Sequence, residues 1–337
     1  MSSGPGDGLR DGPATRLSGT VLEVRELSVE YVMERGTVLA VDRVSFDLAA
    51  GEFLGIVGES GCGKSTLLFA VAQLLTPAGG SVTFKGRNMV GLTDKELTAV
   101  RWKDLSVVMQ SAMNALNPVK SIQAQFADAM RAHGVASKVE IADRSAEVLK
   151  MVGIDPVHLK SYPHQLSGGM RQRSMIAMAM LFTPDLVIMD EPTSALDVVA
   201  QRSLMVQIKE LQEQLGFAII FVTHDMSLVS HFSDRLIVMY AGEVAESGAT
   251  RRVFDSPQHP YSIGLLEAFP SIRGPRVPLT GIPGSPPDLA RIPPGCRFAP
   301  RCPKVMSRCT EAPPELYPVE GTLVRCFLHD GAGAGHG

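Results

Sequence analysis

The stretch Phe53–Ser65, FLGIVGESGCGKS, contains the pattern that decides the fold of this chain. The apolar run FLGIV predicts a buried strand, and the apolar segment 65–75 predicts a helix. Between them, Gly58–Ser65 matches G-x-x-x-x-G-K-[ST], the pattern of a phosphate-binding loop. Its glycines allow the backbone N–H groups to point at phosphate oxygens, and the helix N-terminus adds positive potential. These features predict an α/β nucleotide-binding fold.

The residues of this loop have different predicted roles. Lys64 is expected to reach the β- and γ-phosphates, and Ser65 is expected to hold Mg²⁺. Cys62 is most simply a small residue tolerated in the loop, although a helix N-terminus could make its thiol reactive. An ordinary glycine-rich turn is the alternative, which the flanking strand and helix disfavour. The other predicted ATP contacts are Gly58, Ser60, Gly61, Cys62, Gly63 and Thr66.

A second acidic site follows another apolar run, residues 186–191, LVIMDE. Asp190 can reach Mg²⁺ directly or through water. Glu191 would point elsewhere and could polarise the water that attacks the γ-phosphate. For Glu191, a solvated acid at a strand end is the alternative. Together with the loop, the pair predicts Mg²⁺-dependent hydrolysis of ATP.

Charge and hydropathy exclude several classes of protein. The 32 Lys and Arg residues nearly balance the 35 Asp and Glu residues, and no basic block occurs, which argues against a nucleic-acid partner. No apolar run reaches the roughly 18 to 20 residues of a membrane span, and the N-terminus lacks the apolar stretch of a signal peptide. A soluble, cytosolic protein is expected.

Composition divides the chain into three parts. Residues 1–19 lack periodicity and are expected to be disordered. Residues 20–270 alternate strand and helix patterns, which predicts a parallel sheet with a helical insertion at about 111–175. Thirteen of the 23 Pro residues lie in 270–337, so a small irregular extension is expected over 271–337. The expected strands are 21–31, 38–48, 53–57, 186–190, 217–222 and 235–240, with an amphipathic segment at 198–215.

The segment Leu166–Gln172, LSGGMRQ, resembles the LSGGQ signature of ABC-type ATPases, with Met170 where that family usually has Gln. Ser167, Gly168 and Gly169 would open a helix and present a hydroxyl and N–H groups to an anion. A plain helix cap is the alternative.

The resemblance extends over about residues 21–270, and the other family motifs occur in order. It implies that Tyr31 stacks on adenine, that Gln110 contacts Mg²⁺ and relays to membrane subunits, and that His224 touches the γ-phosphate. Ser194–Asp197 resembles the D-loop, which includes Asp197. The implied fold is a P-loop ABC-type ATPase core with an antiparallel β subdomain and a helical insertion.

The family resemblance also implies how two subunits cooperate. They would pair head to tail, so that each ATP lies between Lys64 and Glu191 of one subunit and the signature of the other. ATP binding would close the dimer and hydrolysis would reopen it.

After residue 255, the stretches SPQHPY (256–261), LLEAFPS and PPGCRFAPRCPKVMSRC resemble the C-terminal extension of ATP-binding subunits from bacterial oligopeptide and dipeptide importers. The resemblance implies a second ATPase subunit, usually a paralogue that forms a heterodimer, and two transmembrane permeases. It also implies an extracytoplasmic binding protein that selects the cargo, and a location at the cytoplasmic face of the membrane. Importers of nickel, glutathione or short oligosaccharides, and a soluble ABC-type ATPase without transport, are the alternatives.

Four of the five cysteines, Cys296, Cys302, Cys309 and Cys326, lie in the extension, separated by five, six and sixteen residues. This spacing matches neither the C-x-x-C pattern of most structural zinc sites nor a ferredoxin run. A cytosolic location disfavours disulfides, and thiolates suit zinc or iron–sulfur clusters. The family resemblance implies a [4Fe–4S] cluster; zinc and simple packing thiols are the alternatives. His329 is an optional further ligand.

Overall fold

A computed structural model describes residues 19–34, 36–110, 115–194, 196–268 and 281–331. The expected disorder of residues 1–19 falls, except for Gly19, outside the described residues. The described chain forms two compact units. Unit 1 contains residues 19–21, 49–51 and 91–219, and unit 2 contains residues 22–48, 52–90 and 220–331.

Unit 1 combines a parallel pair of strands with several helices. Strand β6 (Leu105–Val108) pairs in parallel with β7 (Leu186–Asp190), with Leu105 opposite Leu186. Every residue of β7 is buried, as expected for a strand covered on both faces. The other elements of unit 1 are α2 (Asp94–Val100), α4 (Ile122–Ala132), α5 (Lys138–Met151), η1 (Pro156–Lys160), η2 (Pro163–Gln165), α6 (Gly168–Ala179) and α7 (Val198–Leu215).

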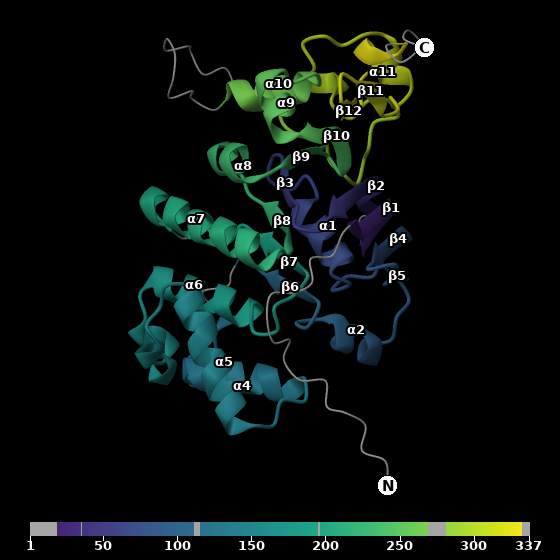
Figure 1. Ribbon diagram of the computed structural model, residues 1–337. Coiled ribbons are helices and arrows are strands. Elements are labelled where there is room, and N and C mark those ends of the chain that lie inside the picture. Colours follow the sequence, from purple (N-terminus) through teal and green to yellow (C-terminus); the bar gives the residue numbers. More distant parts are fainter. Residues whose placement is uncertain (1–18, 35, 111–114, 195, 269–280, 332–337) are drawn as a thin grey trace. The chain divides into compact units, whose positions relative to one another are not determined.

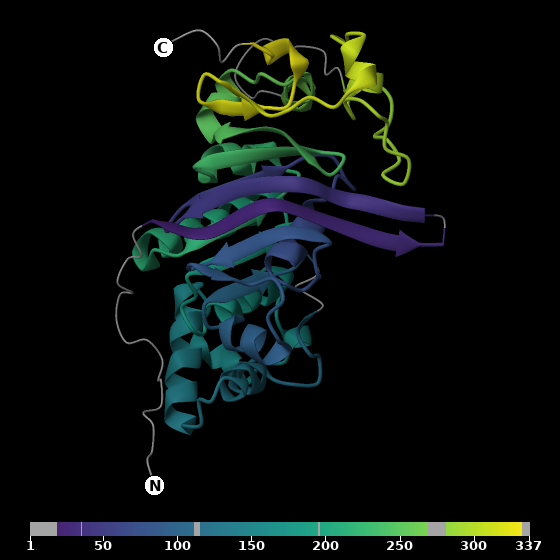
Figure 2. The same ribbon diagram turned by 90° about the vertical axis from the view of Figure 1, so that its right-hand side faces the viewer.

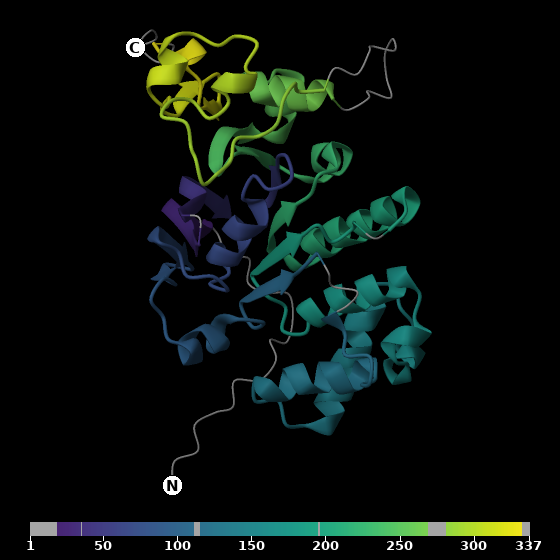
Figure 3. The same cartoon turned by 180° about the vertical axis from the view of Figure 1, so that it is seen from behind.

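The helices of unit 1 begin where the sequence supplies an N-cap. Ser121, Ser137 and Asp197 each accept a hydrogen bond from a backbone N–H in the first turn of α4, α5 and α7. Helix α4 packs on α5, and α5 packs on α6 (teal in Figure 3). The predicted helical segment 111–175 is therefore helical over much of its described part.

Unit 2 contains an antiparallel sheet in the order β2-β1-β4-β5. Its long strands β1 (Thr20–Met33) and β2 (Gly36–Ala49) run side by side (Figure 2). Strand β4 (Gly79–Phe84) pairs with β1 and with the short β5 (Arg87–Asn88). Alternating residues such as Leu22 and Val24 face the core, which agrees with the alternation in the sequence.

A second sheet of unit 2 begins at β3 (Phe53–Val57), the strand before the glycine-rich loop. Strand β3 pairs in parallel with β9 (Arg235–Tyr240), and β9 pairs antiparallel with β10 (Glu243–Ala249). All five residues of β3 are buried. The two predicted strands are thus neighbours, and their parallel pairing agrees with the predicted sheet.

The C-terminal region extends this second sheet. Strand β12 (Thr322–Val324) pairs with β10, and β11 (Tyr317–Val319) pairs with β12 (Figure 1). The sequence pattern predicts an irregular extension here and misses these two strands. Strands of three residues are too short to show a period, and Pro318 lies within β11. Proline is tolerated there because β11 is an edge strand.

The remaining elements of unit 2 are short. They are α1 (Lys64–Val71), α8 (Met226–Phe232), α9 (Thr250–Asp255), α10 (Pro260–Glu267), η3 (Ala299–Arg301), α11 (Arg308–Glu311) and η4 (Phe327–His329), while β8 (Ala218–Val222) spans the boundary of the units. Within the described ranges, every helix is too short or too polar to span a bilayer.

Candidate active site

The glycine-rich loop depends on backbone conformations that only glycine adopts easily. Gly58 has φ 152°, and a Cβ there would lie 2.2 Å from the carbonyl oxygen of Met239. Gly63 has φ 101°, and a Cβ there would lie 2.3 Å from the carbonyl oxygen of Ala40. The curl of the loop therefore requires both glycines for steric reasons within unit 2.

Helix α1 begins at this loop with Gly63 as its N-cap and without a side-chain cap. The side chain of Lys64 is buried, and its Nζ donates to the carbonyl oxygens of Gly58 (2.8 Å) and Glu59 (2.9 Å). An ammonium and the N-terminus of a helix thus face the same loop, which is the chemistry of a phosphate site.

Cys62 does not match the expected reactivity of a thiol at a helix N-terminus. Its side chain is buried, and burial raises the pKa of the thiol above its usual value. The nearby Lys64 ammonium, 3.7 Å from the Sγ atom, opposes this shift without cancelling it. Because the thiolate is the reactive form, Cys62 acts as a small buried residue.

Glu59 makes contacts that sequence reasoning missed. Its backbone N–H donates to the hydroxyl of Tyr261 (2.9 Å), and its carboxylate accepts two hydrogen bonds from Arg301 (2.6 and 2.9 Å). These partners lie 202 and 242 positions away in the chain. No local pattern in the sequence indicates such contacts.

Two other predicted site residues lie in unit 2. Tyr31 lies on β1 with an exposed ring, and its hydroxyl is 3.4 Å from Oγ1 of Thr66. His224 is exposed and lies two positions after the last residue of β8. The next residue, Asp225, caps α8 by accepting from the N–H groups of Ser227 and Leu228. Ser60 and Gly61 are exposed, whereas Ser65 is half-buried.

Unit 1 brings the catalytic candidates Gln110 and Glu191 together. Nε2 of Gln110 donates to Oε2 of Glu191 at 2.7 Å. Asp190 ends β7 and is 3 % exposed, whereas Glu191 is half-buried and has φ 45°. Left-handed backbone at a residue with a side chain stores strain, and such strain is concentrated at functional sites.

The predicted signature opens helix α6 in unit 1. Ser167 is the N-cap, and its Oγ accepts from the N–H of Met170 at 3.2 Å. Gly168 is the first helical residue. A Cβ built at Gly169 would meet nothing within 4 Å. The segment is thus a regular capped helix start, and its second glycine has no steric role within the described chain.

The predicted site residues therefore fall into two groups. Tyr31, Gly58–Thr66 and His224 belong to unit 2, and Gln110, Asp190, Glu191, Ser167–Met170 and Asp197 belong to unit 1. Of the D-loop, Asp197 caps α7, and residue 195 lies outside the described residues.

All four late cysteines line one small cavity of about 10 Å³, together with Pro260, Phe298 and His259. Burial raises the pKa of the Cys296 thiol to about 11 and lowers the pKa of His259 to about 3. His329 does not line the cavity, and its Nε2 lies 3.2 Å from the carbonyl oxygen of Gln258. In the described ranges, no three His, Cys, Asp or Glu side chains are arranged to hold a metal ion. The predicted cluster therefore stays a prediction.

Comparison with protein families identifies two parts of the chain. Residues 41–194 match the model described as "ABC transporter", and residues 245–309 match "Oligopeptide/dipeptide transporter, C-terminal region". A third match over residues 159–230, "AAA domain, putative AbiEii toxin, Type IV TA system", overlaps the first. The first match includes the loop, Asp190 and Glu191, and the second includes Cys296, Cys302 and Cys309.

Similar proteins cover nearly the whole chain. The oligopeptide transport ATP-binding protein OppD of Salmonella typhimurium is 44% identical over 319 residues, covering 93% of this chain and 95% of the relative. The dipeptide transport ATP-binding protein DppD of Bacillus subtilis is 44% identical over 318 residues, covering 92% and 95%.

Solved structures show the same fold. The ATP-binding cassette MJ0796, in a dimeric post-hydrolysis state bound to ADP and Pi, is 31% identical and gives a TM-score of 0.63, covering 68% of this chain and 99% of that one. The cbiO1 protein of Clostridium perfringens is 30% identical with the same TM-score, covering 71% and 92%. The chain therefore belongs to the family of ABC ATPases that includes the ATP-binding proteins of oligopeptide and dipeptide transporters.

Proposed function

We propose that this chain is the ATP-hydrolysing subunit that powers an importer of dipeptides or oligopeptides. One observation carries the choice of cargo. Residues 245–309, which follow the ATPase motifs in the same chain, match the model described as "Oligopeptide/dipeptide transporter, C-terminal region". The relatives named for peptide transport match this region and the ATPase together, so they do not favour nickel, glutathione or oligosaccharides as cargo.

In this proposal Lys64 holds the β- and γ-phosphates and Tyr31 stacks on adenine. The contact between the Tyr31 hydroxyl and Thr66 places Tyr31 beside the loop, and its exposed ring is accessible to a base. His224, exposed after β8, would contact the γ-phosphate. The uncapped start of α1 offers further N–H donors to the phosphates.

The proposed Mg²⁺ ligands are Ser65, Gln110 and Asp190. The donor set suits this ion, which prefers oxygen ligands. The amide nitrogen of Gln110 donates to Glu191, so its side-chain oxygen is the atom that would bind the metal. When bound, Mg²⁺ would neutralise charge on the phosphate oxygens. Glu191, held by Gln110, would orient the attacking water and accept its proton.

The signature residues Ser167, Gly168, Gly169 and Met170 are proposed to serve the ATP of a second subunit. The open space at Gly169 supports this role, because a Cβ there would meet nothing within 4 Å among the described residues of its own subunit. The second subunit is proposed to be a paralogue, and the two are proposed to act on two permeases at the cytoplasmic face of the membrane. An extracytoplasmic protein would deliver the peptide.

The four late cysteines are proposed to hold a [4Fe–4S] cluster, with zinc as the alternative occupant. Their convergence on one cavity supports a shared ligand, since four thiols are a common donor set for both. The cavity is small, so the segments that carry the four cysteines would have to move apart to admit a cluster. Anaerobic purification followed by iron, zinc and acid-labile sulfide analysis tests this part.

The function is tested by co-expressing the chain with its neighbouring genes and reconstituting the complex in vesicles. Peptide supplied outside together with the extracytoplasmic protein should be taken up only when ATP is enclosed inside the vesicles, on the side of this subunit. The matched control is Glu191→Gln, which should retain ATP binding but lower turnover by about 10²- to 10⁴-fold. Uptake of another cargo but not of peptide would reject the cargo assignment. A soluble self-dimer without permeases would reject transport.

A further inference from the structure

The segment Cys296–Cys302 of the C-terminal region contacts the phosphate loop through Arg301. The Arg301 side chain is 4% exposed and lies 2.6 Å from Oε2 and 2.9 Å from Oε1 of Glu59. Glu59 is the second residue of the Gly58–Ser65 loop. Paired N–H···O bonds between a guanidinium and a carboxylate fix direction as well as distance. The orientation of Glu59 is therefore set from outside the loop.

Arg301 is itself held in one orientation. Its Nε donates to the carbonyl oxygen of Pro283 at 2.8 Å, and its Nη1 donates to the hydroxyl of Tyr240 at 3.3 Å. The guanidinium also lies 5.8 Å from the centre of the Tyr240 ring. The hydrogen bonds with Glu59, and then the contact with Tyr240, raise the pKa of Arg301, so the side chain stays charged.

Tyr261 holds the main chain at the same residue. It is fully buried, and its hydroxyl accepts the N–H of Glu59 at 2.9 Å. Its ring packs 4.6 Å from Tyr240 and 5.5 Å from Phe298 between ring centres. Phe298 belongs to the same segment as Arg301, so one aromatic cluster supports both contacts to Glu59.

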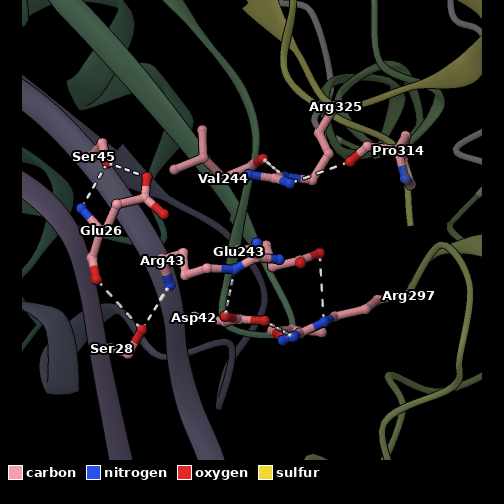
Figure 4. A network of polar contacts seen from close by, with 11 residues as sticks. Glu26, Ser28, Asp42, Arg43, Ser45, Glu243, Val244, Arg297, Pro314 and Arg325 are labelled. Carbon is pink, nitrogen blue, oxygen red and sulfur yellow. Dashed lines mark hydrogen bonds and ion pairs between the residues drawn. The ribbon is translucent and has the colours of Figure 1, made fainter. Parts of the chain in front are cut away.

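A second arginine of the segment, Arg297, is connected to the loop through the turn that contains Ala241 and Gly242. Arg297 is buried, donates to the carbonyl oxygen of Ala241 and pairs with the carboxylates of Asp42 and Glu243 (Figure 4). Gly242, which follows Ala241 in the chain, donates its N–H to the carbonyl oxygen of Cys62 at 2.9 Å. The turn that Arg297 secures is therefore bonded to the loop.

We propose that residues 296–302 brace the phosphate loop and that Arg301 is a positioning residue for nucleotide binding. Glu59 is connected to the proposed phosphate-binding group by one hydrogen bond, in which Nζ of Lys64 donates to the carbonyl oxygen of Glu59. If Glu59 shifts, this oxygen moves, and the position of the Lys64 ammonium changes with it. The brace acts on any nucleotide with a β-phosphate and is independent of the cargo. ATP and ADP should therefore be affected alike, and the hydrolytic step should not.

The test measures the affinity of the purified full-length chain for fluorescent ATP and ADP, and thermal unfolding in parallel. Arg301→Ala should weaken both nucleotides by about tenfold, the loss expected for one charge-assisted contact. Arg301→Lys should restore part of this affinity. Arg308→Ala is the matched control, because Arg308 lies in the same region and pairs with Asp330 at 2.8 Å. It should bind nucleotide like the unmodified chain.

Two more variants keep the test decisive. Glu59→Gln preserves the shape of the side chain, and should weaken binding by roughly threefold even if Arg301→Ala fails to fold. The double variant Arg301→Ala with Glu59→Gln should bind no more weakly than Arg301→Ala alone, because both changes remove one interaction. In the reconstituted complex, KM for ATP should rise and kcat should stay within twofold. Unchanged affinity in Glu59→Gln and Arg301→Lys, or a fall in kcat alone, would overturn the proposal.

Discussion

Helices α1 and α6 both begin at a glycine-rich turn, but the steric surroundings of the glycine differ between the two turns. In α1, Gly63 has a left-handed backbone and no space for a Cβ beside the carbonyl of Ala40. In α6, Gly169 has an ordinary backbone and open space around it. The first helix has no side-chain cap, whereas Ser167 caps the second. The comparison teaches that Gly63 is required for steric reasons within its own unit, whereas no steric requirement within the described chain explains Gly169.

The largest effect should come from Gly63→Ala. The added Cβ would lie 2.3 Å from a backbone oxygen, and φ 101° is strained for alanine. The free energy of unfolding should fall by roughly 2 kcal/mol or more, and nucleotide binding should be lost. Thermal unfolding and nucleotide titration measure both. Gly61→Ala should lower the free energy of unfolding less than Gly63→Ala, because Gly61 has φ 78° but open space for a Cβ. Equal effects would contradict the steric explanation.

Gly169→Ala should separate stability from activity. Because alanine favours helix over glycine and meets nothing within 4 Å, the subunit should keep or gain stability, by up to about 1 kcal/mol. Hydrolysis by the assembled complex should fall at least about tenfold, if the glycine admits the ATP of the second subunit.

The control for that variant is Gly79→Ala in β4, where a Cβ also meets nothing within 4 Å. Its hydrolysis should be unchanged. If Gly169→Ala hydrolyses ATP normally, α6 is an ordinary helix start and the second half of the comparison fails.

The smallest change in this series is expected from Ser167→Ala. Removing the hydroxyl that accepts from Met170 should lower the free energy of unfolding by about 1 kcal/mol, as for other N-caps. A melting curve of the purified subunit detects this loss. Ser167→Asp retains a cap and should restore stability, but its charge should oppose an anionic ligand and leave hydrolysis low. Full activity in Ser167→Asp would argue against an anion at this helix.

Local patterns made much of this protein predictable. The strands 53–57, 186–190 and 235–240 and the loop before α1 follow directly from short apolar runs and glycine spacing, and the chain belongs to the ABC ATPase family that LSGGMRQ resembles. The contacts of Glu59 with Tyr261 and Arg301 were not predictable, because partners more than 200 residues apart leave no local pattern. His259 beside the cysteines was also missed, because it lies 37 positions before Cys296 and follows no local spacing pattern with it.

Strand β12 also protects the protein from association with itself. It covers the outer edge of β10, where Thr322 lies against Gly248 so closely that a Cβ there would be 2.7 Å from its methyl group. The new edge, β11, is only three residues long and contains Pro318, which lacks an N–H donor. Short, proline-containing edges discourage strand addition by other molecules. A chain shortened before Tyr317 would instead present the seven-residue edge of β10, and aggregation would be the expected result.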